Sequence, residues 1–399
     1  MLNSERIESS LNRESKLNNS GKYITSSIVK KTSGAAILFY LLIGFEFLYM
    51  ASPFAAFFYS VYRPGIEFID KYPSIAWLTG FFLPHLVEDT KSPVINLLRP
   101  SGAFIAAAGL LAFIICASQV YYSKIFKKGI VTGGLYRYIR HPQYSAFIVC
   151  SFGLLILWPR YLALVMFITL LFFYYFLAKV EEKECERKFA GSYINYKNST
   201  GMFLPFKIFP SKLLSREKLS LPVKIISVAF LYFSLTALSV LTADLLKKTS
   251  IDKLYTYNSG NAIYISVFKA DEKKIRQIIE LLENDKKISS IKQADKNTYC
   301  INYILPTGMY LSEIPMLKPE NAPIHVFTKN YPEDKIKVIF NKTVYNSRDK
   351  IQKDNLLFNT LSLDPVAEIW IDIDNNKIIK SIELIGNEVR YKNVPEPLF

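Results

Sequence analysis

The sequence predicts a multi-pass α-helical membrane domain followed by a C-terminal soluble α+β domain. Two features lead to this prediction: uncharged runs long enough to cross a bilayer, and a change of hydrophobic pattern near residue 250. The chain has 399 residues, of which 50% are hydrophobic and 15% aromatic, and its formal net charge is +15. This composition is too apolar and too aromatic for a disordered polyelectrolyte.

The positive charge lies almost entirely in the first part of the chain. Residues 250–399 hold 21 basic and 20 acidic residues, whereas residues 1–249 hold 28 and 14. Because the basic part also contains the apolar runs, membrane topology is a better explanation of the positive charge than binding to nucleic acid. We therefore expect no nucleic-acid partner.

About five membrane spans are predicted. They are residues 32–62, 101–123, 144–159, 161–178 and 225–243. Trp158-Pro159-Arg160 separates the third and fourth spans and predicts the turn of a membrane hairpin. Glu46, within the first span, is expected to face other helices or water, and the shorter apolar run 75–87 is expected to be interfacial.

The basic segments alternate with the predicted spans. Basic residues exceed acidic ones in residues 1–31, 123–143 and 179–224, so the positive-inside rule predicts that these segments are cytosolic. Five spans then place the C-terminal domain outside the cytosol, although Lys247 and Lys248 argue weakly against that side. The predicted division is a polar cytosolic tail (1–31), a membrane domain (32–248) and a soluble domain (249–399).

The soluble domain shows local signals for strands and helices. Residues 262–268 read as a strand and residues 271–286 as an amphipathic helix, and Asn375-Asn376 predicts the turn of a hairpin. The predicted apolar stripe of the helix is Ile275, Ile278, Ile279 and Leu282. No nucleotide-binding loop or nucleophile motif is evident, so we expect an accessory domain with an unidentified partner. Neither the cysteines nor the histidines have metal-ligand spacing, and no metal site is predicted.

The residues that could carry chemistry lie mainly in two predicted cytosolic loops. The first is KKGIVTGGLYRYIRHPQY, residues 127–144, and the second is residues 181–206, which follow the hairpin. Because a hairpin starts and ends on the same side of the membrane, Tyr144 and Glu181 should lie close together. Taken singly, each feature has a simpler explanation, such as a topology signal, a structural histidine or a solvated helix end.

The combination of motifs resembles a known family. The motifs are Val131-Thr132-Gly133-Gly134-Leu135-Tyr136, Arg140-His141-Pro142-Gln143-Tyr144, Glu181-Glu182, and Phe189, Tyr193, Tyr196 and Pro205. With the hairpin between them, they resemble the isoprenylcysteine carboxyl methyltransferase and phospholipid methyltransferase family over roughly residues 100–207.

The resemblance implies an integral membrane enzyme that binds S-adenosylmethionine from the cytosol and methylates a membrane lipid or prenylated substrate. The cofactor-binding residues that it implies are Lys128, Gly129, Ile130, Val131, Tyr136, His141, Pro142, Gln143, Tyr144 and Glu181. The first four rest only on their position relative to Gly134 and Tyr136.

The chemistry of the cofactor agrees with these residue types. Its ammonium needs an acceptor such as Glu181, its carboxylate needs donors such as His141 and loop amides, and its sulfonium favours an aromatic face. Tyr136 or Tyr144 could supply that face. Arg140 and Glu182 are the candidate catalytic residues: Glu182 as a base for an amine or thiol acceptor, and Arg140 to orient a carboxylate acceptor.

The sequence also departs from the family pattern, and two alternatives remain. Leu177 stands where prenylcysteine enzymes carry an arginine, which puts a prenylcysteine carboxylate in doubt as the substrate. A sterol-reductase-like enzyme using NADPH is one alternative, but its motif has asparagine where this chain has Gln143. A non-catalytic membrane anchor for a sensor domain is the other, and the intact His141, Tyr144 and Glu181 argue against it.

Overall fold

The computed structural model describes most of the membrane helices and most of the C-terminal sheet. The described residues are 41–45, 47–58, 68–69, 72, 74–85, 87, 89–205, 220–285, 288, 299–311, 316, 325–326, 334–344, 356–360 and 362–384. The predicted tail 1–31 and Glu46 lie outside them. By its internal contacts the chain divides after Pro53, and the two parts are treated separately.

Four helices in the described part of the chain are long and apolar enough to cross a membrane. They are Leu41–Phe58, Pro93–Ile125 (α3), Tyr161–Phe189 within α5 (Tyr161–Ser199), and Leu221–Ile251 (α7). The remaining predicted span corresponds to α4, Pro142–Leu157, which has only 16 residues. These helices fit the predicted helical membrane domain, and the count of five crossings stays a prediction.

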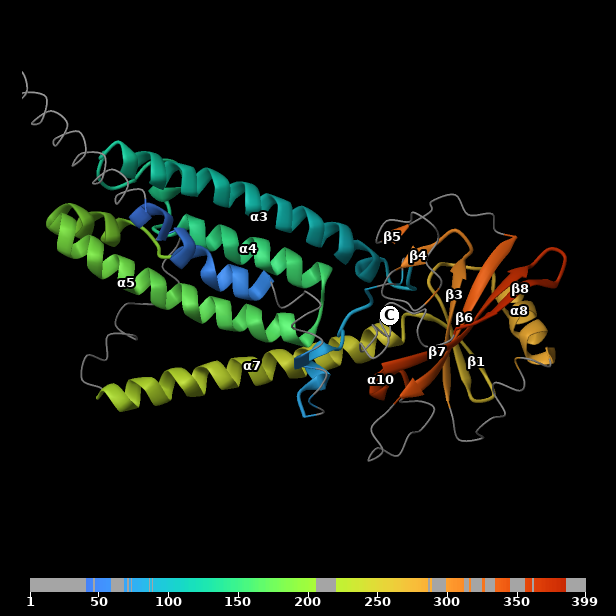
Figure 1. Ribbon diagram of the computed structural model, residues 1–399. Helices are drawn as coiled ribbons and strands as arrows, with labels where there is room; N and C mark the ends of the chain where they lie inside the picture. Colours follow the sequence, from blue (N-terminus) through green and yellow to red (C-terminus); the bar gives the residue numbers. More distant parts are fainter. Residues whose placement is uncertain are drawn as a thin grey trace, which may run out of the picture. The chain divides into compact units, whose positions relative to one another are not determined.

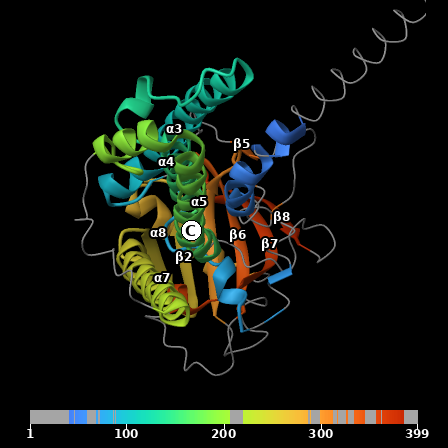
Figure 2. The ribbon, with the colours of Figure 1, turned by 90° about the vertical axis from the view of Figure 1, so that its left-hand side faces the viewer.

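Helices α3, α4 and α5 lie side by side in both ribbon views (Figures 1 and 2). Small residues face each other across α3 and α4, and a Cβ added at Gly109 would lie 2.8 Å from the Cα of Cys150. A Cβ added at Gly153 would lie 2.7 Å from the Cα of Ala106. The backbones therefore approach as closely as small interface residues allow in membrane helices.

The predicted hairpin turn is confirmed, because α4 ends at Leu157 and α5 begins at Tyr161. A short helix, η1 (Ala76–Thr79), leads into a segment that packs against this turn. Phe82 N–H donates to the Pro159 carbonyl at 2.9 Å, and Tyr161 N–H donates to the Gly80 carbonyl at 3.1 Å.

Helices α5 and α7 run antiparallel. The Tyr161 hydroxyl, at the start of α5, donates to Asp244 near the end of α7 at 2.6 Å. Further along, the Thr169 and Tyr232 hydroxyls lie 2.9 Å apart. Consequently α7 ends beside the hairpin turn, and the chain enters the C-terminal domain at the end of α5 that is remote from Glu181.

The C-terminal domain contains a six-stranded sheet in the order β1-β2-β3-β6-β7-β8. The strands are β1 (Tyr255–Ser259), β2 (Ala262–Ser266), β3 (Cys300–Pro306), β6 (Lys335–Val344), β7 (Ser362–Asp372) and β8 (Lys377–Glu383). Among the described strands of this sheet, β2 and β3 are parallel neighbours and the other pairs are antiparallel. Shorter elements are the pair β4 (Tyr310–Leu311) and β5 (His325–Val326), and α10 (Leu356–Asn359).

Helix α8, Glu272–Asn284, covers one face of this sheet (Figure 1). The Asp271 carboxylate caps its start by accepting the Lys273 N–H at 3.0 Å. The predicted apolar stripe is confirmed, because Ile275, Ile278, Ile279 and Leu282 are all buried. The predicted hairpin is also confirmed as β7 and β8, with Asn376 at φ 48° in the turn.

The opposite face of the sheet buries Val87, from the run predicted to be interfacial, together with Leu254 and Ile339. The segment before α3 therefore contributes to the core of the sheet domain. Backbone bonds tie it there, from Asp89 N–H to the Val267 carbonyl at 3.2 Å and from Lys91 N–H to the Lys253 carbonyl at 2.7 Å.

Candidate active site

The candidate site forms where α3 ends, α4 begins and α5 continues past its apolar part. The Tyr144 hydroxyl on α4 donates to the Glu181 carboxylate on α5, across 37 positions of sequence. This contact confirms the expectation that the hairpin brings the two residues together.

His141 lies between two carboxylates. Its Nδ1 is 3.4 Å from Glu181 and its Nε2 is 3.7 Å from Glu182, both longer than an ordinary N–H···O hydrogen bond. The ring is buried, and neither nitrogen has a close hydrogen-bond partner among the described residues. Burial lowers the pKa of His141, but the two carboxylates raise it by more, so the net shift is upward. The His141 ring therefore lies between two carboxylates and keeps unused hydrogen-bonding capacity.

Tyr144 is fully buried, and both faces of its ring are covered. The His141 ring stacks at a centroid distance of 5.6 Å with 13° between planes, and the Tyr174 ring stacks at 4.7 Å with 19°. The Tyr144 ring is therefore covered by protein, and its hydroxyl is the group that bonds to Glu181.

Glu182 is buried and paired with basic side chains, whereas its neighbour Glu181 is partly exposed. The side chain of Glu181 is 39% exposed, whereas that of Glu182 is 1% exposed. Arg140 Nε donates to Glu182 at 2.7 Å, and Lys197 Nζ lies 3.1 Å from it. Arg140 also donates to the carbonyls of Lys197, at 2.9 Å, and Thr200. These contacts favour a structural role for Arg140 and Glu182. The sequence instead predicts Glu182 as a base and Arg140 as the group that orients an anion.

The Tyr136 side chain closes the motif loop onto α3 and α4. Tyr136 lies in a short helix, η2 (Gly134–Arg137), and its hydroxyl is 2.8 Å from Gln143 Oε1 and 3.2 Å from the Cys116 carbonyl. Burial raises the pKa of Tyr136, so the hydroxyl keeps its proton. Tyr196 donates to the Tyr136 carbonyl at 2.6 Å.

The end of α5 holds the histidine motif in place. The prediction of a loop over residues 181–206 is wrong for most of its length, because α5 continues as a helix through Ser199. Beyond it, Arg140 N–H donates to the Gly201 carbonyl at 2.9 Å and His141 N–H donates to the Met202 carbonyl at 3.1 Å. A helix-forming run with i,i+3 and i,i+4 ion pairs explains why the segment stays helical.

Of the four cofactor candidates that rest only on their position in the sequence, Lys128 and Gly129 contact the end of α3. Lys128 Nζ lies 3.3 Å from the Tyr122 hydroxyl, and the Gly129 carbonyl accepts the Ser123 hydroxyl at 3.0 Å. Lys128 and Gly129 are exposed, while Ile130 and Val131 are half-buried. Their assignment to a cofactor stays a prediction. Pro142 is the first residue of α4 and is buried beside His141.

Sequence reasoning missed Gln119, Tyr174 and Lys197. The amide oxygen of Gln119 is buried without a hydrogen bond among the described residues, and its side chain faces Gly134, which adopts φ +60°. A lone amide in an otherwise uncharged span is a usable signal for such an inward position. Tyr174 and Lys197 carry no comparable signal, because many tyrosines and lysines occur in this chain.

Residues 107–192 match the family model of phospholipid methyltransferases. This region belongs to the phospholipid methyltransferase family. The methyltransferase region, residues 107–192, contains Tyr136, His141, Tyr144 and both acidic residues of the site. Lys197 and the segment that pairs with the histidine motif lie just beyond it.

A relative of the methyltransferase region is the protein-S-isoprenylcysteine O-methyltransferase of Saccharomyces cerevisiae. It is 38% identical over 78 residues, which is 19% of this chain and 33% of the relative. The chain thus spans about a third of the length of the curated relative it matches. No solved structure matches the chain.

Proposed function

We propose that the chain is an integral membrane methyltransferase that uses S-adenosylmethionine and methylates a lipid-like or prenylated acceptor. One observation carries the proposal: within the methyltransferase region, an accessible carboxylate, Glu181, lies beside a buried histidine whose ring nitrogens lack close partners. The name of the family and the name of the yeast relative support a lipid-like acceptor.

The residues present fit the polar groups of the cofactor. Glu181 is 39% exposed and can accept from an ammonium, while a ring N–H of His141 can donate to a carboxylate. Both faces of the Tyr144 ring are covered, so the geometry does not support the predicted contact between that ring and a sulfonium. When bound, S-adenosylmethionine supplies an electrophilic methyl carbon on a cationic sulfur.

The protein's own part is to position charges and exclude water. The Tyr144 hydroxyl fixes one oxygen of Glu181, and the stacked Tyr174 ring fixes Tyr144 in turn. Arg140 and Lys197 balance the charge of Glu182, which leaves the charge of Glu181 available to a cationic ligand. No nucleophilic side chain is required for a direct methyl transfer.

We place the site on the cytosolic face. The segment between α3 and α4 carries basic residues and no acidic ones, as the positive-inside rule requires of a cytosolic loop. A soluble cofactor would then meet a membrane-borne acceptor at this face.

The test is to titrate purified protein in detergent with S-adenosylmethionine and, separately, with NADPH. We expect S-adenosylmethionine to bind, and Glu181→Gln to weaken binding by about tenfold or more, because a charge-assisted hydrogen bond is lost. Glu184→Gln is the matched control, since Glu184 lies on the same helix and pairs with exposed Lys188.

Two outcomes would overturn the proposal. Binding of NADPH alone would favour the reductase-like alternative, and binding of neither would favour a non-catalytic anchor. A screen with radiolabelled methyl donor over membrane lipid extracts would then identify the acceptor.

A further inference from the structure

Strand β1 ends the sheet in the described part of the chain, where its only strand neighbour is β2. Ser259 pairs with Ala262 across a two-residue turn, with Gly260 at φ +53°. In such a hairpin the two residues that close the turn exchange both backbone hydrogen bonds. Along the strand, the backbone N–H and C=O groups of every second residue then point away from the neighbouring strand. The N–H and C=O groups of Thr256 and Asn258 therefore face away from β2.

The other edge of the sheet is protected, whereas no such device is seen on β1 among the described residues. Strand β8 carries Lys377, Lys380 and Glu383, and its pairing with β7 is interrupted by a register shift. Charges and bulges of this kind prevent edge strands from pairing with another chain. The β1 sequence, Tyr-Thr-Tyr-Asn-Ser, contains no charge.

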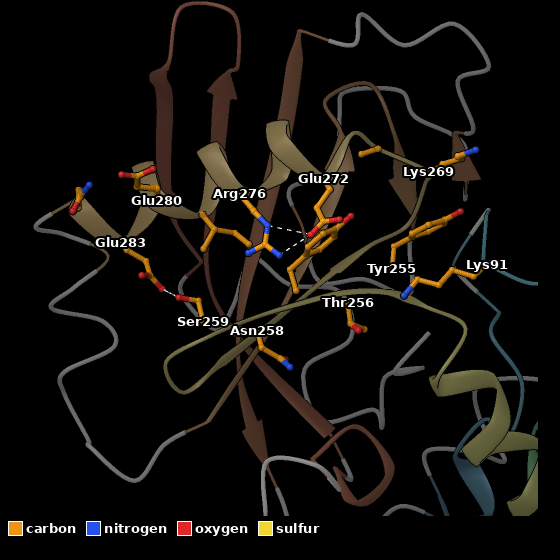
Figure 3. Close-up of a pocket in the computed structure, with 14 residues that line it drawn as sticks. Lys91, Tyr255, Thr256, Asn258, Ser259, Lys269, Glu272, Arg276, Glu280 and Glu283 are labelled. Atoms are coloured by element: carbon orange, nitrogen blue, oxygen red, sulfur yellow. Dashed lines mark hydrogen bonds and ion pairs between the residues drawn. The ribbon is translucent and has the colours of Figure 1, made fainter.

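A groove of about 760 Å³ runs along β1 and beneath α8 (Figure 3). Lys91 and Lys269 lie at the end that holds Tyr255, with Lys91 Nζ 5.9 Å from the centre of the Tyr255 ring. Glu280 and Glu283 lie at the opposite end.

The middle and the acidic end of the groove are fixed by contacts within the domain. At the middle, Glu272 and Arg276 neutralise each other at 2.6 Å. At the acidic end, the Ser259 hydroxyl donates to Glu283. The groove is thus basic at one end of β1 and acidic at the other.

We propose that two copies of this chain associate by antiparallel pairing of their β1 strands. A two-fold axis through Tyr257, the middle residue of β1, would bring Thr256 of each copy opposite Asn258 of the other. The same rotation brings the basic end of each groove against the acidic end of its partner. The charge pattern of one groove therefore matches that of a second copy placed by this rotation. An unrelated extended peptide has no reason to carry the matching pattern, so the pattern favours a second copy as the partner.

The pairing is expected to be weak in solution and stronger in a membrane. One five-residue strand with its flanking side chains buries less than the roughly 1,200 Å² that stable complexes bury. Anchoring both copies in one bilayer raises their effective concentration and compensates for the small area. The inference does not depend on the proposed methyl transfer, because every residue involved lies outside the methyltransferase region.

The test uses energy transfer between donor-labelled and acceptor-labelled copies of the full chain in phosphatidylcholine vesicles. Lys269→Glu and Glu280→Lys each place like charges together, twice per dimer, and should raise the dimer Kd by about tenfold. The double variant restores both attractions and should recover the wild-type signal. Lys380→Glu, on the protected edge, is the matched control and should change nothing.

A second variant tests the backbone pairing itself. Thr256→Pro removes an outward N–H without touching the ladder to β2, and should abolish the transfer. If that variant does not fold, the charge-swap series still decides. Transfer no greater than that of randomly mixed lipid-anchored fluorophores would overturn the proposal. So would a double variant as weak as the two single variants, or capture of an extended peptide by a monomeric chain.

Discussion

Glu181 and Glu182 are neighbours in the chain, yet 39% of the first side chain and 1% of the second are exposed. A helix turns by about 100° per residue, so adjacent side chains point in different directions. Glu182 turns toward Arg140 and Lys197, and Glu181 turns toward Tyr144. Of the two carboxylates, only Glu181 is both held in place and accessible to a ligand.

Glu182→Gln is expected to destabilise the protein rather than to stop one chemical step. The amide cannot balance Arg140 and Lys197, and breaking a buried ion pair costs about 3 kcal/mol or more. The Tm in detergent should fall clearly, whereas Glu184→Gln, at an exposed pair, should change it little. An unchanged Tm with abolished turnover would instead restore Glu182 as the catalytic base.

The pH dependence of stability follows from His141. Its pKa in the folded protein is raised above the ordinary value of 6.5. Its contribution to stability is therefore fully present below that value and is lost as the pH rises through the folded pKa. Between mildly acidic and alkaline pH, the Tm of the wild type should fall more than that of His141→Asn. Parallel curves for the two proteins would contradict this assignment.

At the scale of elements, the close packing of α3 on α4 positions the histidine motif. Gly109→Ala would push its new methyl group into the backbone of Cys150, and overpacking of this kind costs about 1–3 kcal/mol. We expect a lower Tm and weaker cofactor binding. Gly191→Ala is the matched control, because a Cβ there meets nothing within 4 Å, and alanine favours a helix over glycine. Equal effects of the two substitutions would show that close helix packing is not what matters.

Elements with local signals could be predicted from the sequence. The turn at Trp158-Pro159-Arg160, the stripe of α8 and the Asn375-Asn376 turn all depend on residues close together in the chain. The contact of Tyr144 with Glu181 was also predictable, because an antiparallel hairpin leaves few choices for which residues meet.

Other features depend on partners far apart in sequence and could not be predicted. The pairing of Glu182 with Lys197 requires that α5 continue as a helix past its apolar part, which hydropathy alone does not indicate. The parallel pairing of β2 with β3 likewise depends on a crossover that includes α8. The burial of Val87 in the sheet domain could not be predicted, because an apolar run has the same sequence pattern at a membrane surface and in a protein core.

At the scale of the whole molecule, the site and the entry into the C-terminal domain lie toward opposite ends of α5. Tyr161, at the start of α5, contacts the end of α7, while Glu181 lies 20 positions further along α5. If the site faces the cytosol, the C-terminal domain lies outside it.

A membrane-impermeant maleimide tests this topology on intact cells that express a Cys185→Ser background, since the other three cysteines are buried. Lys377→Cys, exposed on β8, should be labelled directly, whereas Lys188→Cys, exposed near the site, should be labelled only after permeabilisation. The reverse pattern would contradict the orientation. Labelling of both positions from one side would contradict an odd number of membrane crossings between Lys188 and Lys377.

The most direct test of the account is transfer of a radiolabelled methyl group from S-adenosylmethionine to membrane lipid extract or to a prenylcysteine. The purified full chain should transfer label into an organic-soluble product, Glu181→Gln should reduce the rate by tenfold or more, and Glu184→Gln should match the wild type. Failure of a folded protein that binds S-adenosylmethionine to label any lipid or prenylated acceptor would contradict the assigned acceptor class. Equal rates for Glu181→Gln and the wild type would contradict the assigned site.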